Sequence, residues 1–246
     1  MLRSHFYKLL HSPSFYIGVF VTLILSLFCL SKYIVSDALQ TISSLMMFVS
    51  YRKMFVFAAA LPFAANFADE WNSKTVTNCI TRQNTIQYAG SNVVVCYISA
   101  FAVVFAGMMI FVMFQATRVP LYDETNIYGS YAPITASGHP MLAIALTVFV
   151  FASSCAMWAV MGLTISAFLP NKYVAICSSF VFCYLLERFM INFPERFSFD
   201  ALSYSTMVGD PIFVFLWSNF IFIAVSAVCG VIFTLGVKRR VENELS

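Results

Sequence analysis

The sequence has few charged residues and lacks the groupings that mark a metal site. Asp, Glu, Lys and Arg make up only 10% of its 246 residues, and the formal net charge is +3. Soluble domains carry about 25% charged residues, so an ordinary soluble fold is excluded. The small net charge also gives no argument for nucleic-acid binding. Because His5, His11 and His139 do not cluster with cysteine or acidic residues, we expect no metal site.

Catalytic and nucleotide-binding motifs are also absent. The sequence contains no HExxH and no GxSxG pattern. Only Lys74-Thr75 joins a lysine to a serine or threonine, and Ser73 precedes it where a phosphate-binding loop needs glycine. We therefore expect that the chain is not an enzyme and holds no cofactor. Any ATP and Mg²⁺ that it depends on would be bound by another polypeptide.

Apolar side chains are what the sequence has in abundance. Hydrophobic residues make up 61% of the chain and include 27 Phe, and the mean hydropathy is +0.83. A soluble fold of this size could not bury so much apolar surface, so lipid must be the solvent for most of it. Since a helix satisfies its own backbone hydrogen bonds in lipid, the composition predicts an all-α integral membrane protein.

Six apolar segments are candidates for membrane-spanning helices. The predicted spans cover residues 14–30, 51–68, 92–116, 141–169, 173–186 and 211–237. Pro62 falls inside the second span, where neighbouring helices can re-satisfy the freed carbonyl group. We treat residues 1–246 as a single transmembrane domain. It comprises an interfacial segment (1–12), a six-span bundle (13–237) and a cytoplasmic tail (238–246).

The distribution of basic residues predicts that both ends lie in the cytoplasm. With that orientation, eight lysines and arginines fall on inner segments: Arg3, Lys8, Lys74, Arg82, Lys172, Lys238, Arg239 and Arg240. Six fall on outer segments: Lys32, Arg52, Lys53, Arg118, Arg188 and Arg196. The cluster at 238–240 directly follows the last span, where the positive-inside bias counts most.

The first eleven residues have the pattern of an amphipathic helix lying on the inner membrane surface. Apolar residues, Phe6 and Leu9 among them, recur at helical spacing on one face, whereas Arg3 and Lys8 lie off it. We call residues 1–12 the elbow, with Arg3, Phe6, Lys8 and Leu9 as its characteristic residues. A secretory signal peptide is the alternative, but no convincing A-x-A site follows the apolar run.

Ionisable side chains are scarce within the spans. The central parts of the first, third, fourth and sixth spans hold none apart from cysteine. Secondary transporters usually carry such groups near mid-membrane, so ion-driven coupling has no obvious carrier there. Glu187-Arg188 stands near the outer end of the fifth span. This pair has two interpretations: an outer gate, or an interfacial pair that reaches water.

The most informative segment is residues 67–91, FADEWNSKTVTNCITRQNTIQYAGS. An acidic residue at the inner end of the second span is followed by a polar turn, a Lys-Thr pair, a short mixed helix and Thr81-Arg82. This order resembles the cytoplasmic loop of ABC-2-type permeases. Phe67, Glu70, Thr75 and Arg82 fit that resemblance, whereas Lys74 stands where the family often has glycine. The elbow and the six-span layout also resemble the family.

The resemblance implies a permease subunit in the bacterial plasma membrane, with no nucleic-acid partner. Its partners would be two copies of an ABC ATPase, a second permease copy in a homodimer, and the lipid bilayer. A short helix with apolar anchors can fill a groove on the ATPase; a solvated loop is the plainer interpretation. The residues that we assign to ATPase coupling are Asp69, Glu70, Trp71, Lys74, Thr75, Val76, Ile80 and Arg82.

The cargo follows from the resemblance and from the apolar spans. Among small permeases of this family, the chain looks most like those that export phenol-soluble modulins or confer bacteriocin immunity. We therefore expect an amphipathic or hydrophobic substrate, with a toxin or antimicrobial peptide favoured. Alternatives are a multidrug or lipid ABC efflux permease, and a six-span channel or scaffold unrelated to ABC transporters.

Overall fold

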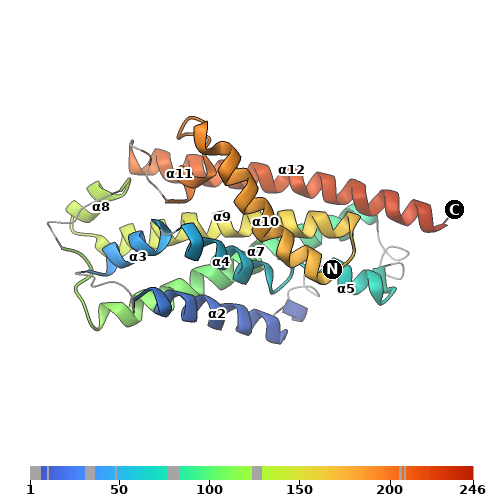
Figure 1. Ribbon diagram of the computed structural model, residues 1–246, viewed down its shortest axis with the longest axis horizontal. Coiled ribbons are helices and arrows are strands. Elements are labelled where there is room, and N and C mark those ends of the chain that lie inside the picture. Colours follow the sequence, from blue (N-terminus) through green and yellow to red (C-terminus); the bar gives the residue numbers. More distant parts are fainter. Residues whose placement is uncertain are drawn as a thin grey trace.

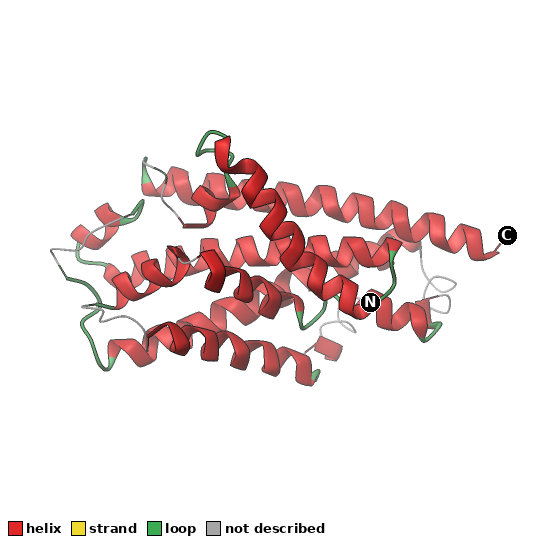
Figure 2. Cartoon of the chain, viewed as in Figure 1, coloured by secondary structure: helices red, strands yellow, loops and turns green. Residues whose placement is uncertain are grey.

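The computed structural model describes most of the chain as helix. The described residues are 7–9, 11–30, 37–47, 49–76, 84–123, 129–204, 207 and 209–245. Within these ranges every regular element is helical and no strand occurs (Figure 2). The elements are α2 (Pro13–Leu30), α3 (Ala38–Met47), α4 (Val49–Ala60), α5 (Asn66–Asn72), α7 (Thr85–Ala116), α8 (Ala132–Ala136), α9 (Pro140–Phe168), α10 (Lys172–Phe189), η2 (Met190–Asn192), α11 (Phe199–Tyr204) and α12 (Pro211–Leu245). The all-α prediction is confirmed.

Among the described residues, three helices are long and apolar enough to cross a membrane: Thr85–Ala116, Pro140–Phe168 and Pro211–Asn243. A shorter apolar helix covers Pro13–Phe28. These helices indicate a membrane-embedded protein, since each of the three exceeds the roughly 20 residues needed to span the hydrocarbon core. The count of six spans and their orientation remain predictions.

The central helix of the bundle is α9, which packs against α4, α7, α10 and α12. The most apolar stretch of α9 is 78% buried inside the protein, whereas the most apolar stretch of α12 is only 33% buried. Small residues let its neighbours approach closely. A Cβ on Gly162 would lie 2.0 Å from Ser179 Oγ and 2.4 Å from the carbonyl oxygen of Ala175, so α10 packs directly on the α9 backbone there.

Residues 51–68, predicted as the second span, do not form one continuous helix. The α4 helix ends at Ala60, residues 61–65 form turns, and α5 begins at Asn66. Pro62 explains the break, because it has no N–H to donate and disfavours helical backbone at Leu61. The Leu61 N–H instead bonds to Ala58 O at 3.3 Å, a tighter turn than in an α-helix.

Three other segments differ from the prediction. Residues expected in an outer connection form α3, which Asp37 caps by accepting from the Gln40 N–H at 2.5 Å. Asn84 accepts from the Ile86 N–H at 3.2 Å, so α7 starts at Thr85 and not at 92. The expected tail from 238 onward continues α12 as helix to Leu245.

The two ends of the bundle carry different elements (Figure 1). One end holds α5, the turn between α9 and α10, and the last turns of α12; we call it the α5 end, and the predicted orientation places it in the cytoplasm. The opposite end, which we call the α8 end, holds α8 and the start of α3. There the N–H groups of Ala38 and Leu39 bond to the carbonyl oxygens of Pro120 and Leu121 at 3.0 and 3.1 Å.

Candidate functional site

At the α5 end, a chain of polar contacts fixes α5 to its neighbours. Glu70 is only 8% exposed; its Oε2 accepts a 2.6 Å hydrogen bond from the Tyr88 hydroxyl, and its Oε1 accepts one of 2.9 Å from Lys8 Nζ. Asn66 Oδ1 accepts from Lys8 Nζ at 2.7 Å, and Asn66 Nδ2 donates to Asn92 Oδ1 at 2.9 Å. We call Lys8, Asn66, Glu70, Tyr88 and Asn92 the anchor network.

The anchor network joins three parts of the chain that are distant in sequence. Lys8 belongs to the elbow, Asn66 and Glu70 to α5, and Tyr88 and Asn92 to α7. Charge-assisted hydrogen bonds such as those of Glu70 are stronger than neutral ones. The network therefore holds α5 on α7, and Glu70 faces the body of the protein.

The other elbow residues are only partly within the described ranges. Leu9 is buried and Tyr7–Leu9 is helical, whereas the predicted elbow residues Arg3 and Phe6 lie outside the described part. Lys8, which lies off the apolar face of the predicted helix, reaches across to α5 with a side chain that is 54% exposed.

The remaining predicted coupling residues lie on different surfaces of the α5 segment. Asp69 and Thr75 are exposed, Val76 is buried, and Ile80 and Arg82 fall outside the described residues. Lys74 follows the α5 C-cap with a φ of 57°, in the left-handed region. Glycine is the residue best suited to that conformation at a helix C-terminus.

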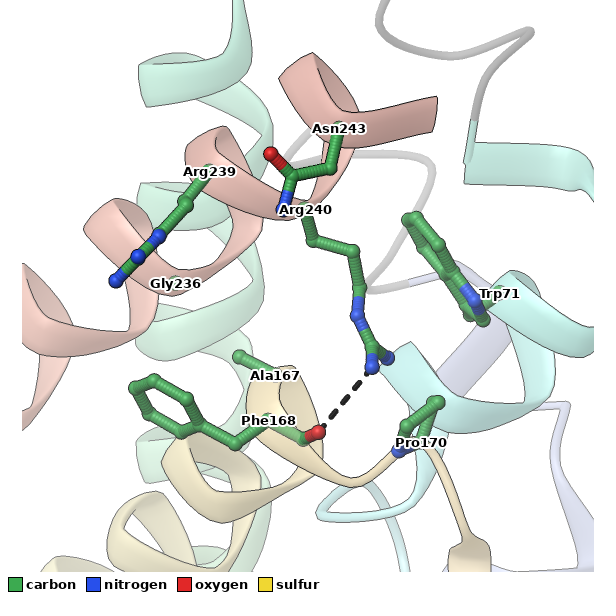
Figure 3. A pocket seen from close by; sticks show the side chains of 8 residues that line it. All are labelled: Trp71, Ala167, Phe168, Pro170, Gly236, Arg239, Arg240 and Asn243. Carbon is green, nitrogen blue, oxygen red and sulfur yellow. Dashed lines mark hydrogen bonds between the residues drawn. The ribbon is translucent and has the colours of Figure 1, made fainter. Parts of the chain in front are cut away.

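Beside α5, a pocket of about 520 Å³ opens between α5, the α9–α10 turn and α12 (Figure 3). Its lining residues are Trp71, Ala167, Phe168, Pro170, Gly236, Arg239, Arg240 and Asn243. The Arg240 guanidinium lies 5.1 Å from the Trp71 ring centroid, and its Nη2 donates to Phe168 O at 3.2 Å (Figure 3). We call this the α5 pocket; it combines two cations with an aromatic wall.

Away from α5, three buried charged side chains meet a fourth, Asp200, whose side chain is 40% exposed. Arg52 Nη2 lies 2.6 Å from Glu187 Oε2 and also pairs with Asp200 Oδ1. Lys53 Nζ lies 3.7 Å from Glu187 Oε2. Arg52 is 2% exposed, Lys53 5% and Glu187 8%. We call Arg52, Lys53, Glu187 and Asp200 the charged cluster; it unites α4, α10 and α11.

Aromatic rings complete the surroundings of the two cations. The Arg52 guanidinium lies 4.1 Å from the centroid of the Tyr204 ring, and Lys53 Nζ lies 4.1 Å from that of Tyr184. Such cation–π contacts partly replace the water that burial removes. Even so, Arg52 Nε and Nη1 are buried without a hydrogen-bond partner among the described residues.

The charged cluster lies beside the middle of α9. Phe55, one turn from Arg52, contacts Phe151 with ring centroids 5.7 Å apart. Phe199, next to Asp200, contacts Trp158 at 5.4 Å. Because Phe151 and Trp158 bracket the midpoint of this 29-residue helix, a bilayer crossed by α9 would contain the cluster near mid-depth, further in than the sequence placed these residues.

The structure therefore alters two expectations about charge within the bundle. Glu187 pairs with Arg52 and Lys53, whereas Arg188 is exposed and takes no part in the charged cluster. No role was predicted for Asp200. The search for ionisable side chains that could couple transport to ions considered the first, third, fourth and sixth spans. The adjacent cations of Arg52-Lys53 within an apolar segment were the signal that pointed to a buried counter-charge.

Among the described residues, no three His, Cys, Asp or Glu side chains lie together in a group that could hold a metal ion. No protein-family model, curated protein or solved structure matches this chain. What the chain does is therefore inferred from the anchor network, the α5 pocket and the charged cluster.

Proposed function

We propose that the chain is the membrane-spanning permease subunit of an ABC exporter in a bacterial plasma membrane. A separate ATPase drives it, and the favoured cargo is an amphipathic peptide. The observation that carries the proposal is the fixing of α5 by the anchor network. The α5 helix contains Phe67 and Glu70 of the segment that resembles the coupling loop of ABC-2-type permeases, and it lies at one end of the bundle (Figure 1).

A fixed α5 suits the transmission of force. Glu70 and Asn66 bond to Tyr88 and Asn92 near the start of α7, a helix of 32 residues. Movement of α5 by a partner would therefore move the end of α7 with it. In this proposal Glu70 acts through the position of α5, and the partner touches the exposed side chains of Asp69, Asn72 and Thr75.

The proposal includes six spans with both ends inside and a homodimer of permeases. The cargo path would be built mainly from apolar side chains. Because the charged cluster contains two cations and two carboxylates, it adds no formal net charge to the bundle interior. Apolar walls bind by area and shape, which suits amphipathic peptides, lipophilic drugs and lipids alike.

The charged cluster would act in this exporter as an outer gate, which was one of the two interpretations of Glu187-Arg188. Glu187 on α10 and Asp200 on α11 both pair with Arg52 on α4. Opening an outer path between these helices would separate the charges. The gating contact is therefore Arg52 with Glu187, and Arg188 has no part in it.

The test is purification of the chain from its own cells, with ATPase retention and stimulation of ATP hydrolysis as readouts. A soluble ATPase should copurify. Charge reversal at exposed Asp69 together with Asn72→Lys should release it, since both changes alter the proposed contact surface. Glu195→Lys, a charge reversal at an exposed turn after α10, is the matched control and should retain the ATPase. Absence of any bound ATPase would contradict the proposal.

Topology can be tested separately in a cysteine-free version of the chain. A single cysteine at Glu195 should react with an impermeant maleimide in whole cells, and one at Asn243 only after lysis. The reverse pattern would place α5 outside the cell, where no ATPase could reach it.

Ion-coupled transport is a second candidate, favoured by the charged cluster beside the middle of α9. Buried ionisable groups at such a depth are typical of ion-driven transporters. The two candidates differ in their energy source. Efflux of cargo from vesicles that survives ATP depletion, but stops when the proton gradient is dissipated and in Glu187→Gln, would favour ion coupling over the ABC proposal.

A further inference from the structure

The α5 pocket has the chemistry of a site for a negatively charged headgroup. Arg239 and Arg240 line it on α12, and Trp71 forms a wall on α5. Planar guanidinium groups match the oxygens of phosphate, and hydrogen bonds between them are charge-assisted. Trp is also a side chain typical of the membrane–water interface.

The Arg240 side chain is held in place, but not all of its hydrogen-bond donors have partners. Its contact with Trp71 and its bond to Phe168 O fix the guanidinium at the pocket. Its Nη1 is buried and has no hydrogen-bond partner within the described ranges. A buried donor of this kind favours an acceptor, and a phosphate oxygen carries negative charge as well.

Exposed apolar residues belong to the pocket lining or directly neighbour it in sequence. Phe168 and Leu169 at the end of α9 are exposed, as is Leu235 on α12. Gly236 also lines the pocket, and a Cβ there would come within 3.1 Å of Ala167 Cβ and 3.3 Å of Phe168 Cζ. A ligand with a charged head and hydrocarbon chains would match both parts, whereas an acidic protein segment would use only the charged part.

We propose that the α5 pocket binds the phosphate headgroup of an anionic phospholipid, from the leaflet that meets the α5 end of the protein. The acyl chains would lie along Phe168, Leu169 and Leu235. Basic pockets between membrane helices are known to hold anionic headgroups. The inference rests on the membrane-embedded helices and on the pocket, and it does not depend on an ATPase partner.

The test is native mass spectrometry of the purified full chain in detergent, titrated with phosphatidylglycerol, phosphatidylcholine or soluble glycerol 3-phosphate. Phosphatidylglycerol should be retained most tightly. Loss of two charge-assisted contacts in Arg239→Gln with Arg240→Gln should weaken its binding at least about tenfold. Lys172→Gln is the control, because Lys172 is an exposed cation at the same end that does not line the pocket.

Folding of each variant is checked by its thermal unfolding profile. Should the double variant unfold, Arg239→Gln alone changes an exposed residue and should still weaken binding about threefold, the lower range for a single hydrogen bond. Binding unchanged in the variants, or equal binding of phosphatidylcholine, would overturn the proposal. The proposal would also be overturned if glycerol 3-phosphate bound as tightly as the lipid. That result would indicate a site for soluble anions that does not need the bilayer.

An acidic segment of a protein partner is the remaining occupant to distinguish. Loss of a copurifying protein in Arg239→Gln with Arg240→Gln, with no lipid retained by the wild-type chain, would assign the pocket to that partner and overturn the lipid proposal. If the pocket binds lipid but no ATPase copurifies, the proposal here stands and only the ABC exporter proposal fails.

Discussion

The anchor network and the charged cluster are both polar groups buried in an apolar protein, but they differ in their access to water. In the anchor network the Lys8 side chain is 54% exposed and that of Glu70 is 11% exposed. In the charged cluster the Arg52 and Glu187 side chains are 3% and 6% exposed. At the Lys8–Glu70 pair, water can replace a lost partner of Lys8. At the Arg52–Glu187 pair it cannot, so these two charges depend on their counter-charges, although the Asp200 side chain is 40% exposed.

This difference predicts which contacts are most sensitive to substitution. Removing one partner of a buried ion pair leaves an uncompensated charge, whereas removing one partner of a half-exposed pair leaves a group that water can solvate. A buried cluster beside the middle of α9 is therefore suited to a two-state contact that is either fully made or fully broken. A network at the α5 end in which only the cation, Lys8, is half-exposed is suited to holding a helix in place.

The largest effect is expected for Glu187→Leu. It leaves Arg52 paired with Asp200 alone, and it removes the acidic partner of the buried Lys53, so the free energy of unfolding should fall by about 3–5 kcal/mol. The measurement is unfolding in mixed micelles of increasing denaturing detergent. Arg188→Leu changes the exposed neighbouring residue and should alter stability by less than about 0.5 kcal/mol.

The same substitution can be combined with Arg52→Met to measure the coupling. The double variant should be less destabilised than the sum of the two single variants, because the charge left unpaired by each single change is removed by the other. Additive losses would show that Arg52 and Glu187 do not depend on each other, and the contrast with the anchor network would disappear.

An intermediate effect is expected for Glu70→Gln. The amide keeps the shape of the side chain but loses the charge that strengthens its bonds to Lys8 and Tyr88. Because Lys8 is half-exposed, we expect a loss of only about 1–2 kcal/mol. The rate of amide hydrogen exchange across α5 should rise in the same variant. Asp69→Asn, which changes the exposed neighbouring residue, should leave both the unfolding free energy and the exchange rate unchanged. A loss as large as that of Glu187→Leu would contradict the solvent-access argument.

The sequence predicted features that depend on neighbouring residues better than features that depend on contacts between distant parts of the chain. Pro140 and Pro170 bound α9, and the predicted limits of 141–169 differ from Pro140–Phe168 by one residue at each end. The anchor network and the charged cluster needed tertiary packing, since Lys8 meets Glu70 across 62 positions and Arg52 meets Glu187 across 135. No local pattern contains those pairings. Hence Glu70 was expected on a contact surface although its carboxylate faces α7.

A smaller effect is expected at the end of α5. Lys74 adopts a φ of 57°, so Lys74→Gly should relieve the steric strain of a side chain in that region and stabilise the protein by about 1 kcal/mol. The result would be read in the same detergent unfolding measurement, with Ser73→Gly at the preceding C-cap, where φ is −84°, as the matched control. If both changes stabilised the protein, the effect would not come from the left-handed backbone at Lys74. It would instead be explained by a change in the entropy of the loop.

The smallest effect is expected from salt, and it separates the two networks most directly. Raising ionic strength from 0.1 M to 1 M shortens the Debye length from about 10 Å to about 3 Å, which screens exposed charges but barely reaches buried ones. The coupling energy between Lys8 and Glu70, measured by a cycle of Lys8→Met and Glu70→Gln, should therefore fall by a few tenths of a kcal/mol, since exposed pairs contribute only about 0.2–1 kcal/mol. The coupling energy between Arg52 and Glu187, measured in the same detergent and salt series, should stay constant. Equal salt sensitivity of the two pairs would mean that water reaches the charged cluster, and the contact between α4 and α10 would then be better described as part of a hydrated path.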